Sequence, residues 1–172
     1  MNPTAFELWL KSTWLADLMH TAWAWPTAES LHFFGLCLLM GTVGVFDLRL
    51  IGLAKQIPLP ALHRLIPFGI GGFIINILTG ISFFTAEPDQ YLYNPSFHTK
   101  MLFMTLAGIN VLLFYTTMFK KVQNCGPGDQ APMPARIMGA ASLVFWIGVI
   151  SGGRLLTFFR PPIISCPWCW FS

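Results

Sequence analysis

Four long apolar stretches, separated by short segments rich in proline and glycine, dominate the pattern of the chain. They cover residues 30–53, 65–86, 99–119 and 135–159. Each is long enough to cross a hydrocarbon core of about 30 Å as a helix that rises about 1.5 Å per residue. Because the connections are short, consecutive helices become antiparallel neighbours. The sequence therefore predicts an all-α membrane protein, a four-helix up-down bundle that forms a single integral membrane domain over residues 1–172.

The two ends of the chain differ from these spans. In residues 4–25, Phe6, Trp9 and Trp14 recur at roughly helical spacing, and charged residues interrupt the apolar run. This pattern predicts an interfacial amphipathic helix with its aromatic rings at headgroup depth. The charges and the absence of a small-residue cleavage site predict no secretory signal peptide. Residues 160–172 form an aromatic tail.

Composition excludes two classes of protein. Of the 172 residues, 55% are hydrophobic and 10% are charged, whereas soluble domains carry about 25% charged residues. A net charge of +3 is too small to cover a nucleic-acid backbone. Basic residues flank the first and third connections, and acidic residues occupy the second, so the positive-inside rule predicts both termini outside. In a bacterial inner membrane, that side is the periplasm.

Five ionisable side chains fall at one depth near the outer ends of the predicted spans: Glu29, His32, His98, Lys100 and Arg154. An ionisable group in a span costs up to about 2.5–3.5 kcal/mol, so each needs a reason. We expect them to form one outer-leaflet site that binds haem b or a quinone. In that site, the two histidines are candidate ligands of the haem iron, and the lysine or the arginine neutralises the negative charge of the haem propionates. Each residue also has a purely structural interpretation. The lysine could extend its ammonium group to the membrane surface, the histidines could form interface hydrogen bonds, and the glutamate could pair with the arginine.

Other polar and small residues have simpler expected roles. Gly35 leaves room for a flat ligand or a neighbouring backbone, and its helix face is predicted to look inward. At the inner end, we expect Asp47 to form a salt bridge and the nearby basic residues to contact anionic lipid. His63 is predicted to be a surface residue. We expect Cys37 to pack as a small hydrophobe and the Cys166/Cys169 pair to form a disulfide.

Several short motifs carry a resemblance. The segments 26–32, 41–52, 94–100 and 107–110, in this order, resemble an uncharacterised family of four-helix bacterial inner-membrane proteins over residues 14–159. His32 and Gly35, with Lys100 at the start of the third helix, are distantly similar to copper-resistance D-type proteins. They are also distantly similar to small haem-binding membrane proteins of the protoporphyrinogen-oxidising type.

No reaction is recognisable in the sequence, so whether the protein is an enzyme stays open. The leading hypothesis is a small redox-associated membrane subunit of electron transport, with the haem or quinone pocket in the outer leaflet. The alternative is a non-catalytic accessory or anchor subunit of a larger membrane complex, and transport of a metal or small solute is a third possibility. Membrane lipids and other membrane subunits are the expected partners.

Overall fold

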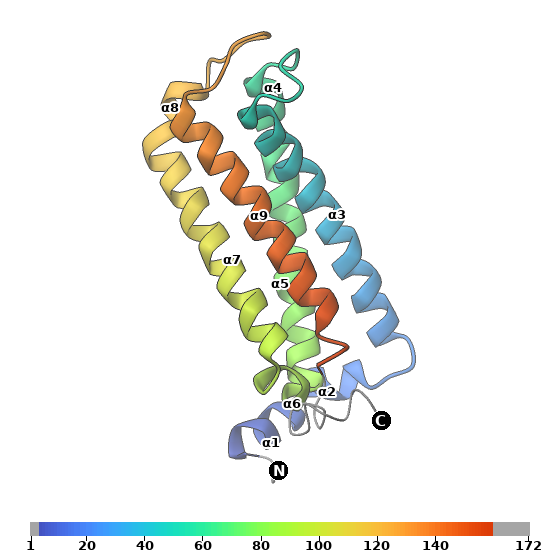
Figure 1. Ribbon diagram of the computed structural model, residues 1–172. Helices are drawn as coiled ribbons and strands as arrows, with labels where there is room; N and C mark the ends of the chain where they lie inside the picture. Colours follow the sequence, from blue (N-terminus) through green and yellow to red (C-terminus); the bar gives the residue numbers. More distant parts are fainter. Residues whose placement is uncertain (1–3, 160–172) are drawn as a thin grey trace.

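Four long helices form the body of the protein. The computed structural model describes residues 4–159, and within this range every regular element is helical. The long helices are α3 (Ala24–Ile51), α5 (Ile66–Ala86), α7 (Pro95–Leu113) and α9 (Met133–Leu155). They run alternately up and down (Figure 1), and each belongs to a helical segment long and apolar enough to span a membrane. The predicted four-helix up-down membrane bundle is confirmed.

Short helices close the two ends of the bundle. At one end lie α1 (Ala5–Lys11), α2 (Trp14–Met19) and α6 (Pro88–Leu92), and we call this the terminal end (Figure 1). At the other, the loop end, lie α4 (Leu59–His63), α8 (Phe119–Val122) and the connection 123–132. Helix α7 reaches α8 through a π-helical turn, η1 (Phe114–Met118).

The expected single helix over residues 4–25 is wrong. Helix α1 ends at Lys11, and α2 begins at Trp14. The break has a local cause, because the hydroxyls of Ser12 and Thr13 donate to the carbonyls of Trp9 and Leu10 and compete with helical hydrogen bonding.

The ends of the spans also shift from their predicted positions. Helix α3 begins at Ala24 rather than at residue 30, and α7 begins at Pro95 rather than at residue 99. Pro26 and Pro95 lie in the first turns of these helices, where a missing N–H costs little. Proline residues in this chain therefore occur in the first turns of helices as well as in the connections between them.

Helices α3 and α5 pack so closely that their backbones are in contact. A Cβ added to Gly35 would lie 2.7 Å from the carbonyl oxygen of Gly72, and one added to Gly72 would collide with the carbonyl oxygen of Gly35. The room beside Gly35 is thus filled by a neighbouring backbone and not by a ligand. Helix α7 packs on α9, and α9 on α3, whereas α5 and α7 touch each other very little. The expectation that consecutive helices are neighbours is therefore wrong for α5 and α7.

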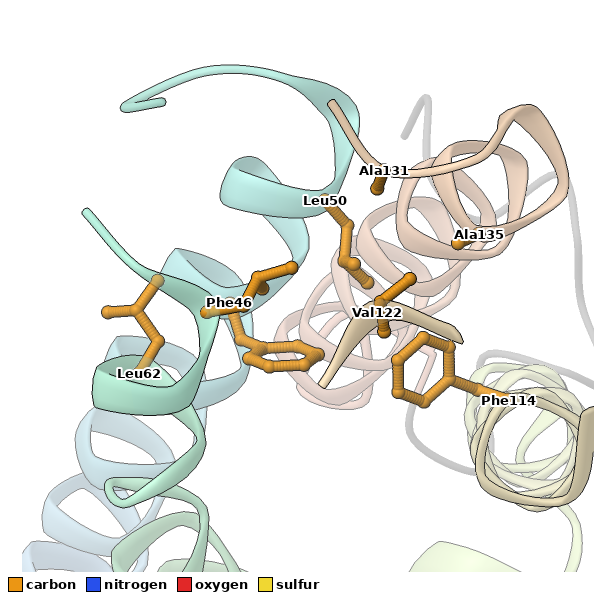
Figure 2. Close-up of a cluster of buried hydrophobic side chains, with 8 residues drawn as sticks. Phe46, Leu50, Leu62, Phe114, Val122, Ala131 and Ala135 are labelled. Atoms are coloured by element: carbon orange, nitrogen blue, oxygen red, sulfur yellow. The ribbon is translucent and has the colours of Figure 1, made fainter. Parts of the chain in front are cut away.

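The loop end holds an apolar cluster and a buried arginine. Phe46, Leu50 and Phe114 belong to this cluster (Figure 2). Arg49 is fully buried, and its Nε donates to the carbonyl of Ile57 at 2.6 Å. Its Nη2 donates to the carbonyls of residues 126 and 129 at 2.9 and 3.1 Å. One guanidinium therefore ties α3 to both connections of the loop end.

The predicted Asp47 salt bridge is wrong. Within residues 4–159, the ion pairs are Lys11 with Asp89 and His20 with Glu87, and all four of these residues lie outside the long helices. The basic groups close to Asp47 along the chain do not pair with it, because Arg49 is used by backbone carbonyls. Asp47 is instead buried inside the bundle.

Candidate functional site

His32 has a defined partner at the terminal end of the bundle. Its Nδ1 lies 2.7 Å from the hydroxyl of Thr79 on α5, and its ring contacts Phe83 edge-on at 5.7 Å between centroids. Because the Thr79 hydroxyl donates to the carbonyl of Ile75, its oxygen is free to accept. The Nδ1 of His32 therefore carries the proton, and its Nε2 remains for another partner.

The other predicted outer-site residues do not gather into one network. His98 is exposed, and its Nε2 lies 2.9 Å from the carbonyl of Leu92. Glu29 and Arg154 are exposed and form no ion pair with each other, so the structural pair considered for them is wrong. Lys100 is half-buried against α9 beside Gly152 and within electrostatic reach of His32.

The described range contains no group of three or more His, Cys, Asp or Glu side chains that could hold a metal ion. Binding of haem or quinone at the terminal end stays a prediction.

A cavity of about 290 Å³ lies between the four long helices, toward the loop end. All four helices line it, mostly with aliphatic and aromatic side chains. Its polar lining residues are few, and they come from three of the long helices and the turn η1: Asp47, Asn110, Tyr115, Ser142 and Trp146. This composition, an apolar enclosure with a few convergent polar groups, is typical of sites for small molecules.

Two atoms in this lining lack hydrogen-bond partners. Asp47 is 5% exposed and accepts a hydrogen bond from the hydroxyl of Ser142, but its Oδ2 has no partner. Trp146 is 7% exposed, and its indole Nε1 has none either. A buried polar atom without a partner costs about 1–3 kcal/mol. The wall of the cavity thus includes one residue with an unpaired acceptor and one with an unpaired donor.

The cavity is partly open, and α5 and α7, which both line it, barely touch each other. Aromatic side chains make contacts toward both ends of the bundle. Phe84 stacks on Phe97 at 5.9 Å near the terminal end, and the Nε2 of His63 lies 3.2 Å from the Tyr115 hydroxyl near the loop end.

His63 and the π-helical turn lie at the loop end of the bundle. His63 is partly exposed, in agreement with its predicted surface position, and its ring lies 4.7 Å from that of Phe119. The turn η1 carries Phe114 and Tyr115, which both line the cavity. Single π-helical turns inside α-helices occur frequently at functional sites, so this turn supports a ligand-binding role for the cavity.

The sequence analysis missed the cavity, although part of its signal was visible. Asp47 and Asn110 are polar residues inside apolar spans, and such residues mark candidate functional sites. Ser142 and Trp146 gave no comparable signal, because a small hydroxyl and an indole are ordinary in a membrane helix. Cys37 also differs from expectation, since it is exposed on α3. The expected disulfide and the aromatic tail lie outside the described residues.

These features define a four-helix integral membrane protein with a cavity inside its bundle. The chain belongs to a family of unknown function, DUF6644, whose profile matches residues 9–159. A comparison with curated proteins found no match, and a comparison with solved structures found none. The expected membership of an uncharacterised family is confirmed, while the similarity to copper-resistance and haem-binding proteins stays a prediction.

Proposed function

We propose that this protein is a quinone-binding subunit of a membrane redox system, and that the quinone ring lies in the cavity between the four helices. The observation that carries the proposal is the pair of unpartnered atoms, Asp47 Oδ2 and Trp146 Nε1, in one apolar enclosure. A quinone carbonyl accepts a hydrogen bond from the indole N–H. A quinol hydroxyl donates one to the carboxylate. One ligand class thus satisfies both atoms.

The size and walls of the cavity support a ring-shaped ligand. Its volume of about 290 Å³ lies at the lower limit of small-molecule pockets, about 300–1,000 Å³. One substituted ring therefore fills it, and an isoprenoid chain has to leave between α5 and α7. Phe46, Phe73 and Phe114 line the cavity, and aromatic walls favour stacking with a flat ring.

A haem b at the terminal end has weaker support. Of its expected ligands, His98 already bonds through Nε2 to the Leu92 carbonyl, whereas Nε2 of His32 stays available. The cavity, by contrast, presents polar atoms that have no partner. The accessory-subunit hypothesis differs from both in predicting no bound ligand.

The proposal includes an orientation in a bacterial inner membrane. The loop end carries the exposed cations Arg64, Lys120 and Lys121, so the positive-inside rule places it in the cytoplasm and the terminal end in the periplasm. In intact cells, an impermeant maleimide should label Trp23→Cys at the terminal end but not Lys121→Cys, in a background without the native cysteines. Labelling of Lys121→Cys but not of Trp23→Cys would show that the protein has the opposite orientation.

Purified protein in lipid nanodiscs tests the binding. Solvent extraction should recover quinone from the membrane-purified protein, and titration with a short-chain ubiquinone and a short-chain menaquinone should give saturable binding. Trp146→Phe removes one hydrogen bond of about 0.5–1.5 kcal/mol and should weaken binding roughly 2- to 13-fold. A reduced-minus-oxidised absorption spectrum tests for haem in the same sample.

Two glycines supply a matched steric test. Gly108 and Gly41 are both exposed in the middle of membrane helices, and a Cβ at either meets no atom within 4 Å. Only Gly108 lines the cavity. Gly108→Phe should therefore block quinone binding, and Gly41→Phe should leave it intact. Equal binding by both variants, or a haem spectrum that disappears in His32→Ala, would contradict the proposal.

A further inference from the structure

A second, smaller cavity opens at the loop end. This loop-end cleft has a volume of about 220 Å³ and lies between α3, α4 and α8. Phe46, Leu59 and Val122 give it an apolar floor, and its polar lining residues are His63, Arg64 and Gln123. An apolar floor beside a cationic side chain suits an amphipathic ligand with an anionic head.

The charge around the cleft is uncompensated. Arg64, Lys120 and Lys121 are exposed at this end, and none of them forms an ion pair within the part of the chain that the structure describes. Asp129 is the exposed carboxylate of the loop end, and its Oδ2 accepts a hydrogen bond from the backbone N–H of Gly126 at 2.8 Å. The cleft therefore attracts anions.

The His63 side of the cleft is held in place. The Tyr115 hydroxyl lies 3.2 Å from Nε2 of His63, and the ring of Phe119 lies against the imidazole at 4.7 Å. These contacts orient the imidazole and leave its Nδ1 for a ligand. The rim of the cleft is thus partly preorganised, which lowers the entropic cost of binding.

The cleft and the intramembrane cavity are separate sites. Phe46 lines both, and its ring meets that of Phe114 edge-on, at 5.8 Å and an interplanar angle of 86° (Figure 2). Phe46 thus belongs to the wall of both spaces, and Phe114 lines only the intramembrane cavity. A ligand of the cleft therefore need not displace a ligand of the cavity.

We propose that the loop-end cleft binds the phosphate group of an anionic phospholipid. The Arg64 guanidinium and the Gln123 amide donate hydrogen bonds to the phosphate oxygens, since a guanidinium matches the geometry of phosphate. The acyl chains lie along the start of α5, where Leu65 and Phe68 are 40% and 59% exposed. Basic pockets at the ends of membrane helices bind anionic headgroups in this manner.

Thermal unfolding of the delipidated full-length protein in neutral detergent tests this site. Phosphatidylglycerol should raise the unfolding temperature in a saturable manner, whereas phosphatidylcholine and inorganic phosphate should not. Arg64→Gln should weaken the phosphatidylglycerol effect at least about tenfold, the factor expected for the loss of a charge-assisted hydrogen bond to phosphate. Because Arg64 is exposed, this variant should fold.

The control removes the same charge outside the cleft. Lys55→Gln lies at the same end but does not line the cleft, and it should change the lipid affinity less than twofold. Equal weakening by Lys55→Gln and Arg64→Gln would show diffuse attraction and overturn the proposal. Equal stabilisation by inorganic phosphate alone would assign the cleft to free phosphate and also overturn it. Arg64→Gln should leave quinone titration of the cavity unchanged, which separates this test from that of the proposed function.

Discussion

Replacing Asp47 by leucine should stabilise the protein and abolish its ligand binding. The Asp47 carboxylate is 5% exposed in an apolar cavity, with a hydrogen bond from Ser142 and an Oδ2 atom without a partner. Leucine has the same length and branching, and the adjacent cavity has room for its slightly larger methyl groups. The substitution therefore removes an unsatisfied acceptor without overpacking the bundle.

The expected gain follows from two opposing contributions. Removal of an unsatisfied buried acceptor contributes about 1–3 kcal/mol, and loss of the hydrogen bond from Ser142 costs about 0.5–1.5 kcal/mol. A net stabilisation of about 1 kcal/mol should remain. For a chain of this size, each kcal/mol raises the unfolding temperature by about 2–4 °C, so we expect an increase of roughly 2–4 °C.

Thermal unfolding in detergent without added quinone measures this change, and quinone titration of the same sample measures binding. Asp129→Leu is the matched control, because the Asp129 carboxylate accepts from the backbone N–H of Gly126. The control should lower the unfolding temperature. If Asp47→Leu also lowers it by several degrees, Asp47 is a structural residue, and the argument from its unpartnered oxygen is wrong.

Three further predictions concern the stability of the bundle, and thermal unfolding measures each. Gly72→Ala places a methyl group against the facing carbonyl of α3 and should cost about 1–3 kcal/mol, whereas Gly71→Ala, which meets nothing within 4 Å, should be neutral. Arg49→Met strips the donor from three carbonyls at the loop end and should cost about 3 kcal/mol or more. The hydrogen bond to Asp89 raises the pKa of Lys11 above 10.5. The stabilisation by this ion pair is below about 1 kcal/mol because both side chains are solvated. It should persist at neutral pH and disappear as the pH rises through the pKa of Lys11 in the folded protein. An Asp89→Asn variant that keeps the same loss at high pH would refute this assignment.

The bundle was predictable because length and hydropathy suffice to identify membrane helices. A span has to satisfy its own backbone groups in lipid, so a long apolar stretch leaves few alternatives to a helix. The helix ends were less predictable, since Pro26 and Pro95 were interpreted as parts of connections although both lie in first turns. The break after Lys11 depends on side-chain hydrogen bonds that apolar periodicity does not show.

The cavity was less predictable, because it depends on how helices face one another. Asp47 follows Leu39 and Val43 at helical spacing, and all three line the cavity. The charges close to it along the chain suggested a salt bridge instead. The predicted terminal-end residues lie at similar depth, but depth does not determine rotation about the helix axis. His32 consequently bonds to Thr79, and Glu29 is exposed.

Photoaffinity labelling with an azido-quinone tests the central claim most directly, because it locates the bound ring on the chain. The protein in nanodiscs is irradiated with the probe, digested and analysed by mass spectrometry, with and without an excess of unlabelled short-chain quinone. The account predicts competable labelling in the cavity-lining parts of α7 and α9, around residues 104–115 and 138–146, and its loss in Gly108→Phe but not in Gly41→Phe. Competable labelling around His32 at the terminal end, or labelling that unlabelled quinone does not reduce, would contradict it.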